Sequence, residues 1–132
     1  MPISHITLRR GHPDAYLDAL SNSLHEALVD TFEVPENDRF QVFHELDLKA
    51  LCFDRNYLAG PRSDNWVLIE ITAGRPRSTT IKRSFYRCLA ERLADSPGIA
   101  PADVMVVIRH NQAEDWSFGR GLTSMLEMEN ET

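Results

Sequence analysis

Apolar side chains follow a strand-like pattern in four segments of this chain and a helical spacing in two. The strand-like segments are short, rich in β-branched or aromatic residues, and cover residues 2–8, 39–46, 66–72 and 104–108. The helical segments repeat apolar residues every three or four positions: Leu17, Leu20, Leu24, Leu28 and Phe32 in the first, and Ile81, Phe85, Cys88, Leu89 and Leu93 in the second. The predicted order is strand, helix, strand, then strand, helix, strand.

Turn and capping residues set the predicted ends of both helices. Asp14 lies at the predicted start of the first helix, where a negative charge interacts favourably with the helix dipole. The first helix is predicted to end before Pro35. Ser78 or Thr79 is the expected cap of the second helix, which ends at Pro97-Gly98. Two β-α-β units in tandem predict one α+β domain over residues 1–132, with both helices packed on one face of a four-stranded mixed sheet.

The sheet face turned away from the helices carries several apolar strand residues. The composition of the 132-residue chain, 42% hydrophobic and 26% charged, is otherwise that of an ordinary globular protein, which leaves few large apolar patches exposed. We therefore expect this face to be buried by association of copies of the chain rather than left exposed in a monomer.

Charge and composition argue against several classes of protein. A net charge of −6 disfavours nucleic-acid binding, and no apolar run is long enough for a membrane span. The first residues lack the features of a signal peptide, so a cytoplasmic location is expected. Neither the cysteines, Cys52 and Cys88, nor the five histidines show metal-ligand spacing, and a glycine-rich phosphate loop is missing. We expect no metal and no cofactor.

Pro2 is the first candidate for chemistry. Removal of Met1 leaves a secondary amine at the start of a strand, and an α-amino group has an unperturbed pKa near 8, so its surroundings can make it an acid or a base. The ordinary alternative is that Met-Pro reflects amino-terminal processing alone.

Arg75 and Arg77 flank Pro76 directly after the strongest strand. In extended backbone, positions i and i+2 point the same way, so two guanidinium groups can meet on one carboxylate. A solvated basic turn is the alternative. Asp38 lies between the first helix and second strand, where its carboxylate could reach Pro2 and favour the cationic amine, or could pair locally with Arg39.

Trp116 and Phe118 lie in an aromatic, glycine-rich segment near the end of the chain. Two aromatic rings at i and i+2 could wall a small pocket and exclude water, or could anchor the segment against a neighbouring subunit. The two interpretations are compatible.

Together these features resemble the tautomerase superfamily, most closely its malonate semialdehyde decarboxylases. The resemblance covers essentially the whole chain and rests on Met1-Pro2 opening a strand, the tandem β-α-β order, Pro35-x-x-Asp38-Arg39, Gly74–Ser78 and Asp115–Gly121. It implies Pro2 as the catalytic amine, Asp38 as its acidic partner, Arg75 and Arg77 as a carboxylate clamp, and Trp116 and Phe118 as a hydrophobic wall. It also implies a small carboxylate substrate, a homotrimer built around a central barrel, and no metal or organic cofactor.

The implied reaction is decarboxylation of a 3-oxo acid such as malonate semialdehyde, with a protonated Pro2 stabilising the enolate. An iminium formed by the amine is a competing route. Residues 45–64 and the acidic end, Leu122–Thr132, depart from the decarboxylase pattern. Keto–enol tautomerisation of phenylpyruvate-like acids and hydration or dehalogenation of haloacrylates therefore stay open, as does a trimeric binding protein without catalysis.

Overall fold

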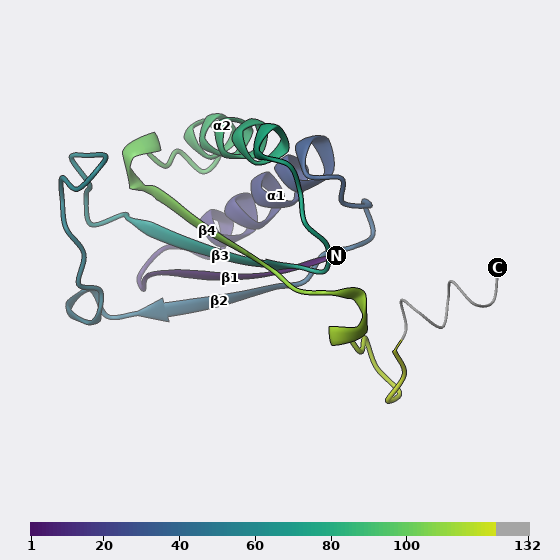
Figure 1. Cartoon of the computed structure of the whole chain (residues 1–132). Helices are drawn as coiled ribbons and strands as arrows, with labels where there is room; N and C mark the ends of the chain where they lie inside the picture. The colour runs from purple at the N-terminus through teal and green to yellow at the C-terminus, as the bar shows by residue number, and fades with distance from the viewer. Residues whose placement is uncertain (124–132) are drawn as a thin grey trace.

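The computed structural model describes residues 1–123, which form a two-layer domain with one sheet and two helices (Figure 1). Most of the acidic end that begins at Leu122 therefore lies outside the described residues. The four strands are β1 (Pro2–Arg9), β2 (Gln41–Leu46), β3 (Val67–Ala73) and β4 (Val104–His110). The two helices are α1 (Asp14–Thr31) and α2 (Thr79–Asp95), with single 3₁₀ turns at Leu48–Ala50, Pro101–Asp103 and Ala113–Asp115.

The sheet has the order β2-β1-β3-β4 and mixes parallel and antiparallel pairs. Each β-α-β unit contributes a parallel pair, β1 with β2 and β3 with β4. The two units join through the antiparallel pair β1 and β3, in which Pro2 lies opposite Ala73. The start of β1 is therefore beside the end of β3.

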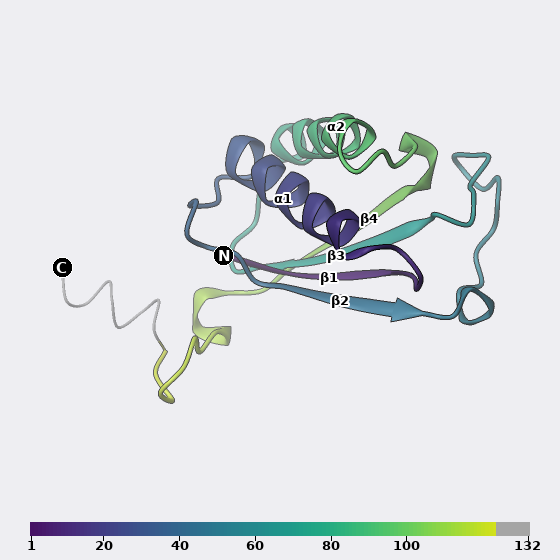
Figure 2. The ribbon, with the colours of Figure 1, turned by 180° about the vertical axis from the view of Figure 1, so that it is seen from behind.

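Both helices cover the same face of the sheet, as Figures 1 and 2 show from opposite sides. Residues on β1 and β3 alternate strictly between buried and partly exposed because successive strand side chains point to opposite faces. The buried set packs against the apolar stripes of the helices and forms one core, whose largest fully buried members are Phe32, Phe85, Ile6, Leu8, Leu20, Leu24, Ile69, Ile71, Leu89 and Leu93. The predicted fold class and helix positions are confirmed.

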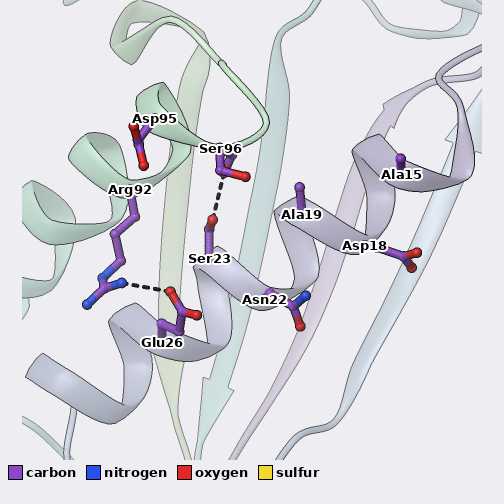
Figure 3. Close-up of a pocket in the computed structure, with 9 residues that line it drawn as sticks. All are labelled: Ala15, Asp18, Ala19, Asn22, Ser23, Glu26, Arg92, Asp95 and Ser96. Carbon is purple, nitrogen blue, oxygen red and sulfur yellow. Dashed lines mark hydrogen bonds and ion pairs between the residues drawn. The ribbon is translucent and has the colours of Figure 1, made fainter.

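Polar contacts join the two helices on the outer side of their layer. Ser23 donates to the backbone carbonyl of Ser96 at 2.6 Å, and Arg92 pairs with Glu26 at 2.7 Å (Figure 3). Arg92 also pairs with Asp30. A shallow groove of about 480 Å³ lies between these contacts, toward the start of α1 and the end of α2. Neither helix has the length and apolarity to cross a membrane, within residues 1–123.

The sheet face without helices combines apolar and charged side chains. Val42 and Met105 are 40% and 44% exposed on it. The imidazoles of His5 and His44 stack with ring nitrogens 2.8 Å apart, and Arg109 pairs with Glu70 at 3.1 Å, across the middle of the same face. The expected uncovered face is present.

Two strand boundaries differ from the prediction by two residues, and three others differ by one. The second strand begins at Gln41 instead of Arg39, because the side chain of Arg39 turns to α1 and donates to Asn22 at 2.7 Å. The fourth strand continues past Ile108 to His110, where Ala73 of β3 still supplies a pairing partner.

Ser78 is the residue that caps α2, since its hydroxyl accepts a hydrogen bond from the backbone N–H of Ile81 at 3.2 Å. Ser78→Ala is expected to lower the free energy of unfolding by about 1 kcal/mol, because the backbone N–H of Ile81 in the first turn of α2 loses its hydrogen-bond acceptor. Ser84→Ala, at an exposed position inside the same helix, is the matched control. Urea unfolding followed by circular dichroism compares the two, and equal stabilities would contradict the capping role.

Candidate active site at the amino terminus

Four chain segments meet around the first residues of β1. The backbone N–H of Gly74 donates to the carbonyl of Met1 at 3.2 Å, which extends the β1–β3 pairing one residue beyond Pro2 and Ala73. Arg75 follows directly in the chain. On the other side, the N–H of Ser4 donates to the carbonyl of Phe40, just before β2. The amino terminus thus lies at the end of the sheet where the α1–β2 and β3–α2 connections pass (Figure 1).

Asp38 binds the amino group at the start of the chain. Its Oδ2 lies 2.8 Å from the Met1 amine, and its side chain is 11% exposed. A turn holds it there, because the N–H of Asp38 donates to the carbonyl of Pro35 at 3.0 Å. The predicted approach of Asp38 to the amino end is therefore present, and the local pair with Arg39 is not, since Arg39 binds α1 instead.

The Met1 amine is in an environment that favours its neutral form. Burial lowers its pKa from the usual 8.0, and the nearby Arg77 and Arg75 lower it further. The hydrogen bond and charge of Asp38 raise the pKa but do not outweigh the burial. The protonation of a free Pro2 stays a prediction.

Arg77 is buried and bound to the backbone. Its Nε and Nη2 both donate to the carbonyl of Phe32, at 3.1 and 3.0 Å, and its Nη1 donates to the carbonyl of Arg75 at 2.8 Å. The guanidinium carbon also lies 4.5 Å from the centre of the Phe32 ring. Phe32 is the residue that directly follows α1 and caps its carboxyl end. The guanidinium of Arg77 therefore binds a carbonyl at the end of the helix where the helix dipole is negative. Three of the five donors of Arg77 thus position the segment from Arg75 to Arg77.

Arg75 is half exposed and pairs with a carboxylate of the protein. Its Nη2 lies 2.7 Å from Oε2 of Glu33, the residue after Phe32, and this contact lowers the pKa of the Glu33 carboxyl. The two arginines therefore meet at one corner of the fold, formed by Phe32 and Glu33, but each binds a different group there. Their action as a clamp on one substrate carboxylate stays a prediction.

A cluster of aromatic rings lies on the other side of the amino terminus. The rings of Trp116 and Phe118 stack at 5.5 Å, and Phe118 contacts Phe40 at 5.6 Å. Trp116 packs against Gly74, where an added Cβ would come within 3.0 Å of the indole nitrogen, and it donates to Oδ1 of Asn111 at 2.6 Å. Trp116, Phe118 and Phe40 thus form an aromatic cluster near the amino terminus, and the role of Trp116 and Phe118 as the wall of a substrate pocket stays a prediction.

Sequence reasoning did not identify three residues of this site: Glu33, Phe40 as part of the wall, and Asn111. Glu33 is 42 positions from Arg75 in the chain, so no local spacing signals the pair. Asn111 follows β4 directly, and a polar residue at a strand end near an aromatic segment is the one hint the sequence offers. Residues 1–123 contain no group of three or more His, Cys, Asp and Glu side chains able to hold a metal ion.

Charged and aromatic side chains thus lie around the amino terminus of this chain. Comparison with known proteins shows the family to which the chain belongs. Residues 38–119 and residues 2–58 match two family profiles, each described as a tautomerase enzyme. The chain belongs to the tautomerase family, which confirms the resemblance seen in the sequence.

Relatives of similar length support this assignment. The probable tautomerases YusQ and YrdN of Bacillus subtilis (strain 168) are 35% and 36% identical to the chain over 96% of its length, and the match covers 100% and 97% of each relative. A solved malonate semialdehyde decarboxylase is 35% identical, with a TM-score of 0.89 over 96% of this chain and 98% of that one. A second, solved with the inhibitor 3-bromopropiolate, is 28% identical with the same TM-score over 96% of each chain.

More distant structures share the fold. A fused 4-OT described as a symmetric trimer has a TM-score of 0.76 at 21% identity, over 93% of this chain and 96% of that chain. At this identity the likeness concerns the arrangement of strands and helices.

The two arginines are expected to differ in their effect on stability. Arg77→Met removes the donors of a buried carbonyl while keeping an apolar side chain, so the free energy of unfolding should fall by about 1–3 kcal/mol. Arg75→Met breaks a half-exposed ion pair and should cost less than about 1 kcal/mol. Urea unfolding of both variants measures the difference. A larger loss for Arg75→Met than for Arg77→Met would refute the buttressing role of Arg77.

Proposed function

We propose that this chain decarboxylates a small 3-oxo acid such as malonate semialdehyde, with Pro2 as the reacting amine once Met1 has been removed. The observation that carries the proposal is the pairing of an amino-terminal amine with Asp38 at 2.8 Å, beside Arg75, Arg77 and an aromatic wall. The likeness to two malonate semialdehyde decarboxylases over 96% of the chain supports it. So does the description of one of these enzymes, which includes a form with its amino-terminal proline changed to alanine.

In the proposed reaction the substrate carboxylate binds Arg75, and its aldehyde oxygen faces the Pro2 ammonium. The bond between the carboxylate carbon and the α-carbon breaks, carbon dioxide leaves, and the electron pair moves into an enolate. The negative charge thus travels from the arginine end toward the ammonium, so the ammonium interacts more strongly with the transition state than with the substrate. Proton transfer from Pro2 to the α-carbon gives acetaldehyde, and water returns a proton to the amine.

The surroundings of Pro2 suit this role. Asp38 favours the cationic amine, and the rings of Trp116 and Phe118 offer an apolar surface beside it, so that a bound substrate would exclude water and strengthen the charge interactions inside the site. An iminium between the secondary amine and the aldehyde carbonyl would serve the same purpose, since its positive nitrogen accepts the same electron pair. Both routes require a Pro2 nitrogen that is free of Met1.

A second candidate is keto–enol tautomerisation, in which a neutral Pro2 moves a proton between carbon and oxygen. One observation favours it: the net environment of the Met1 amine lowers its pKa toward the neutral form. The two Bacillus subtilis relatives are themselves described as probable tautomerases, which also favours this alternative. Addition of water to an unsaturated acid is the third possibility, since the related decarboxylase is described with a hydratase activity.

We also propose that the chain assembles as a homotrimer through the sheet face that carries no helix. The apolar side chains exposed on that face support this proposal. So does the fused 4-OT of the same fold, which is described as a symmetric trimer.

The site predicts which acids react and which variants fail. A panel of 3-oxo acids, phenylpyruvate enol and haloacrylates is incubated with the parent, Pro2→Ala and Arg75→Ala, and products are followed by ¹H NMR. We expect decarboxylation by the parent and a loss of at least about 10²-fold in kcat/KM for Pro2→Ala, because general acid catalysis contributes that much. Arg75→Ala should act mainly by raising KM.

Intact-mass measurement accompanies this assay, because an attached Met1 makes the Pro2 nitrogen an amide. A parent that lacks Met1 and yet reacts no faster than Pro2→Ala on any acid would refute the proposed site. Proton exchange without decarboxylation would instead favour the tautomerase alternative.

The trimer is tested with two substitutions of similarly exposed apolar residues. Val42→Glu adds a charge to the open sheet face, and Tyr86→Glu adds one to the outer surface of α2, at 40% and 39% exposure in the single chain. Sedimentation velocity should give three times the chain mass for the parent and for Tyr86→Glu, and a smaller mass for Val42→Glu. A monomeric parent would refute the proposed assembly.

A further inference from the structure

Glu33 holds an unusual backbone position at the corner where both arginines bind. It follows Phe32 at the end of α1 and has φ of 59°, in the left-handed region that residues with a side chain seldom adopt. Arg77 fixes the carbonyl of Phe32 through two hydrogen bonds. The carboxylate of Glu33 is thereby presented to Arg75 at 2.7 Å.

The Glu33 carboxylate is chemically the same group that the proposed function assigns to the substrate at Arg75. Both partners are about half exposed, 51% for Arg75 and 50% for Glu33. Ion pairs with this exposure are weak, because water and salt screen them and two long side chains must be ordered. A substrate carboxylate can therefore displace Glu33 or share the guanidinium with it, in each case against an internal competitor.

Charge at the site gives the pair a second consequence. With Pro2 protonated, as the proposed function requires, the amine, Arg75 and Arg77 carry three positive charges against the two negative charges of Asp38 and Glu33, which leaves one unbalanced positive charge. A substrate with one carboxylate neutralises this charge. A dicarboxylate would leave an excess negative charge in a partly buried site, which is unfavourable.

We propose that Glu33 is a specificity-determining residue, which lowers the affinity of Arg75 for carboxylates in general and selects acids with one carboxylate over those with two. The inference rests on the proposed function of Arg75 as the substrate-carboxylate site. It assigns no reacting atom to Glu33. The residue acts by occupying Arg75 and by its charge.

The test uses two probes that differ by one carboxylate, propionate and malonate, with malonate having the skeleton of the proposed substrate. Their dissociation constants are measured by NMR titration at fixed low salt for the parent and Glu33→Gln. We expect Glu33→Gln to bind propionate up to about fivefold more tightly, the effect of releasing an exposed ion pair. Malonate should tighten by about tenfold or more, because it also gains from the extra positive charge. The KM of the oxo acid should fall while kcat stays near the parent value.

Glu36→Gln is the matched control. Glu36 is exposed in the same α1–β2 connection, and the change removes the same charge at a side chain away from Arg75. It should leave both affinities within about twofold of the parent. Glu33→Gly is a second test variant, since glycine adopts positive φ without strain and the variant should fold and bind like Glu33→Gln.

Two results would overturn the proposal: no change in the ratio of malonate to propionate affinity in Glu33→Gln and Glu33→Gly, or an equal change in Glu36→Gln. The proposed function fails separately. If the parent turns over none of the acids, but Glu33→Gln alters malonate binding and Arg75→Ala abolishes it, the selectivity role stands and the decarboxylase proposal falls. If the parent decarboxylates malonate semialdehyde while the affinity ratio is unchanged, the outcome is the reverse.

Discussion

The hydrogen bonds from Arg77 to the carbonyl of Phe32 position the part of the site that contains Arg75 and Glu33. They join the end of α1 to the start of the connection into α2, so two segments from different halves of the chain become one rigid corner. The same guanidinium binds the carbonyl of Arg75 and fixes the backbone on which that side chain stands. Because the cation is buried, these contacts persist where an exposed arginine would exchange partners with water. The positions of Arg75, Arg77 and Glu33 near the amino terminus follow from this corner.

Opposing electrostatic effects act on the amino terminus of the chain. Burial and two arginines favour a neutral amine, whereas Asp38 favours a cation. Because these influences oppose one another, a further charge nearby, such as an anion at Arg75, would change the pKa of the amine. A bound carboxylate adds negative charge near the amine and favours the ammonium. Substrate binding and the acid form of the amine are therefore expected to promote each other.

The hydrophobic periodicity was sufficient to predict the layers of the fold. The three-to-four-residue spacing puts Leu24 on the core face of its helix, and the two-residue alternation puts Ile69 on the core face of its strand. It predicted the second strand too long, because the side chain of Arg39 binds Asn22 on α1, a tertiary contact that no strand propensity contains. The aromatic wall could be anticipated from Trp116 and Phe118. The pair of Glu33 and Arg75 could not, because it depends on the left-handed turn after Phe32, which glycine adopts more readily than glutamate.

The antiparallel pairing of β1 with β3 relates the two β-α-β units by an approximate two-fold rotation, with consequences for the number of sites. The rotation places the start of β3 where the start of β1 lies in the other unit, at the opposite end of the sheet. However, Val67 is joined to Trp66 by a peptide bond, and an amide nitrogen offers neither a proton nor a lone pair at neutral pH. Only one of the two equivalent positions can therefore carry an amine, and the residues near Val67 have no amine to position.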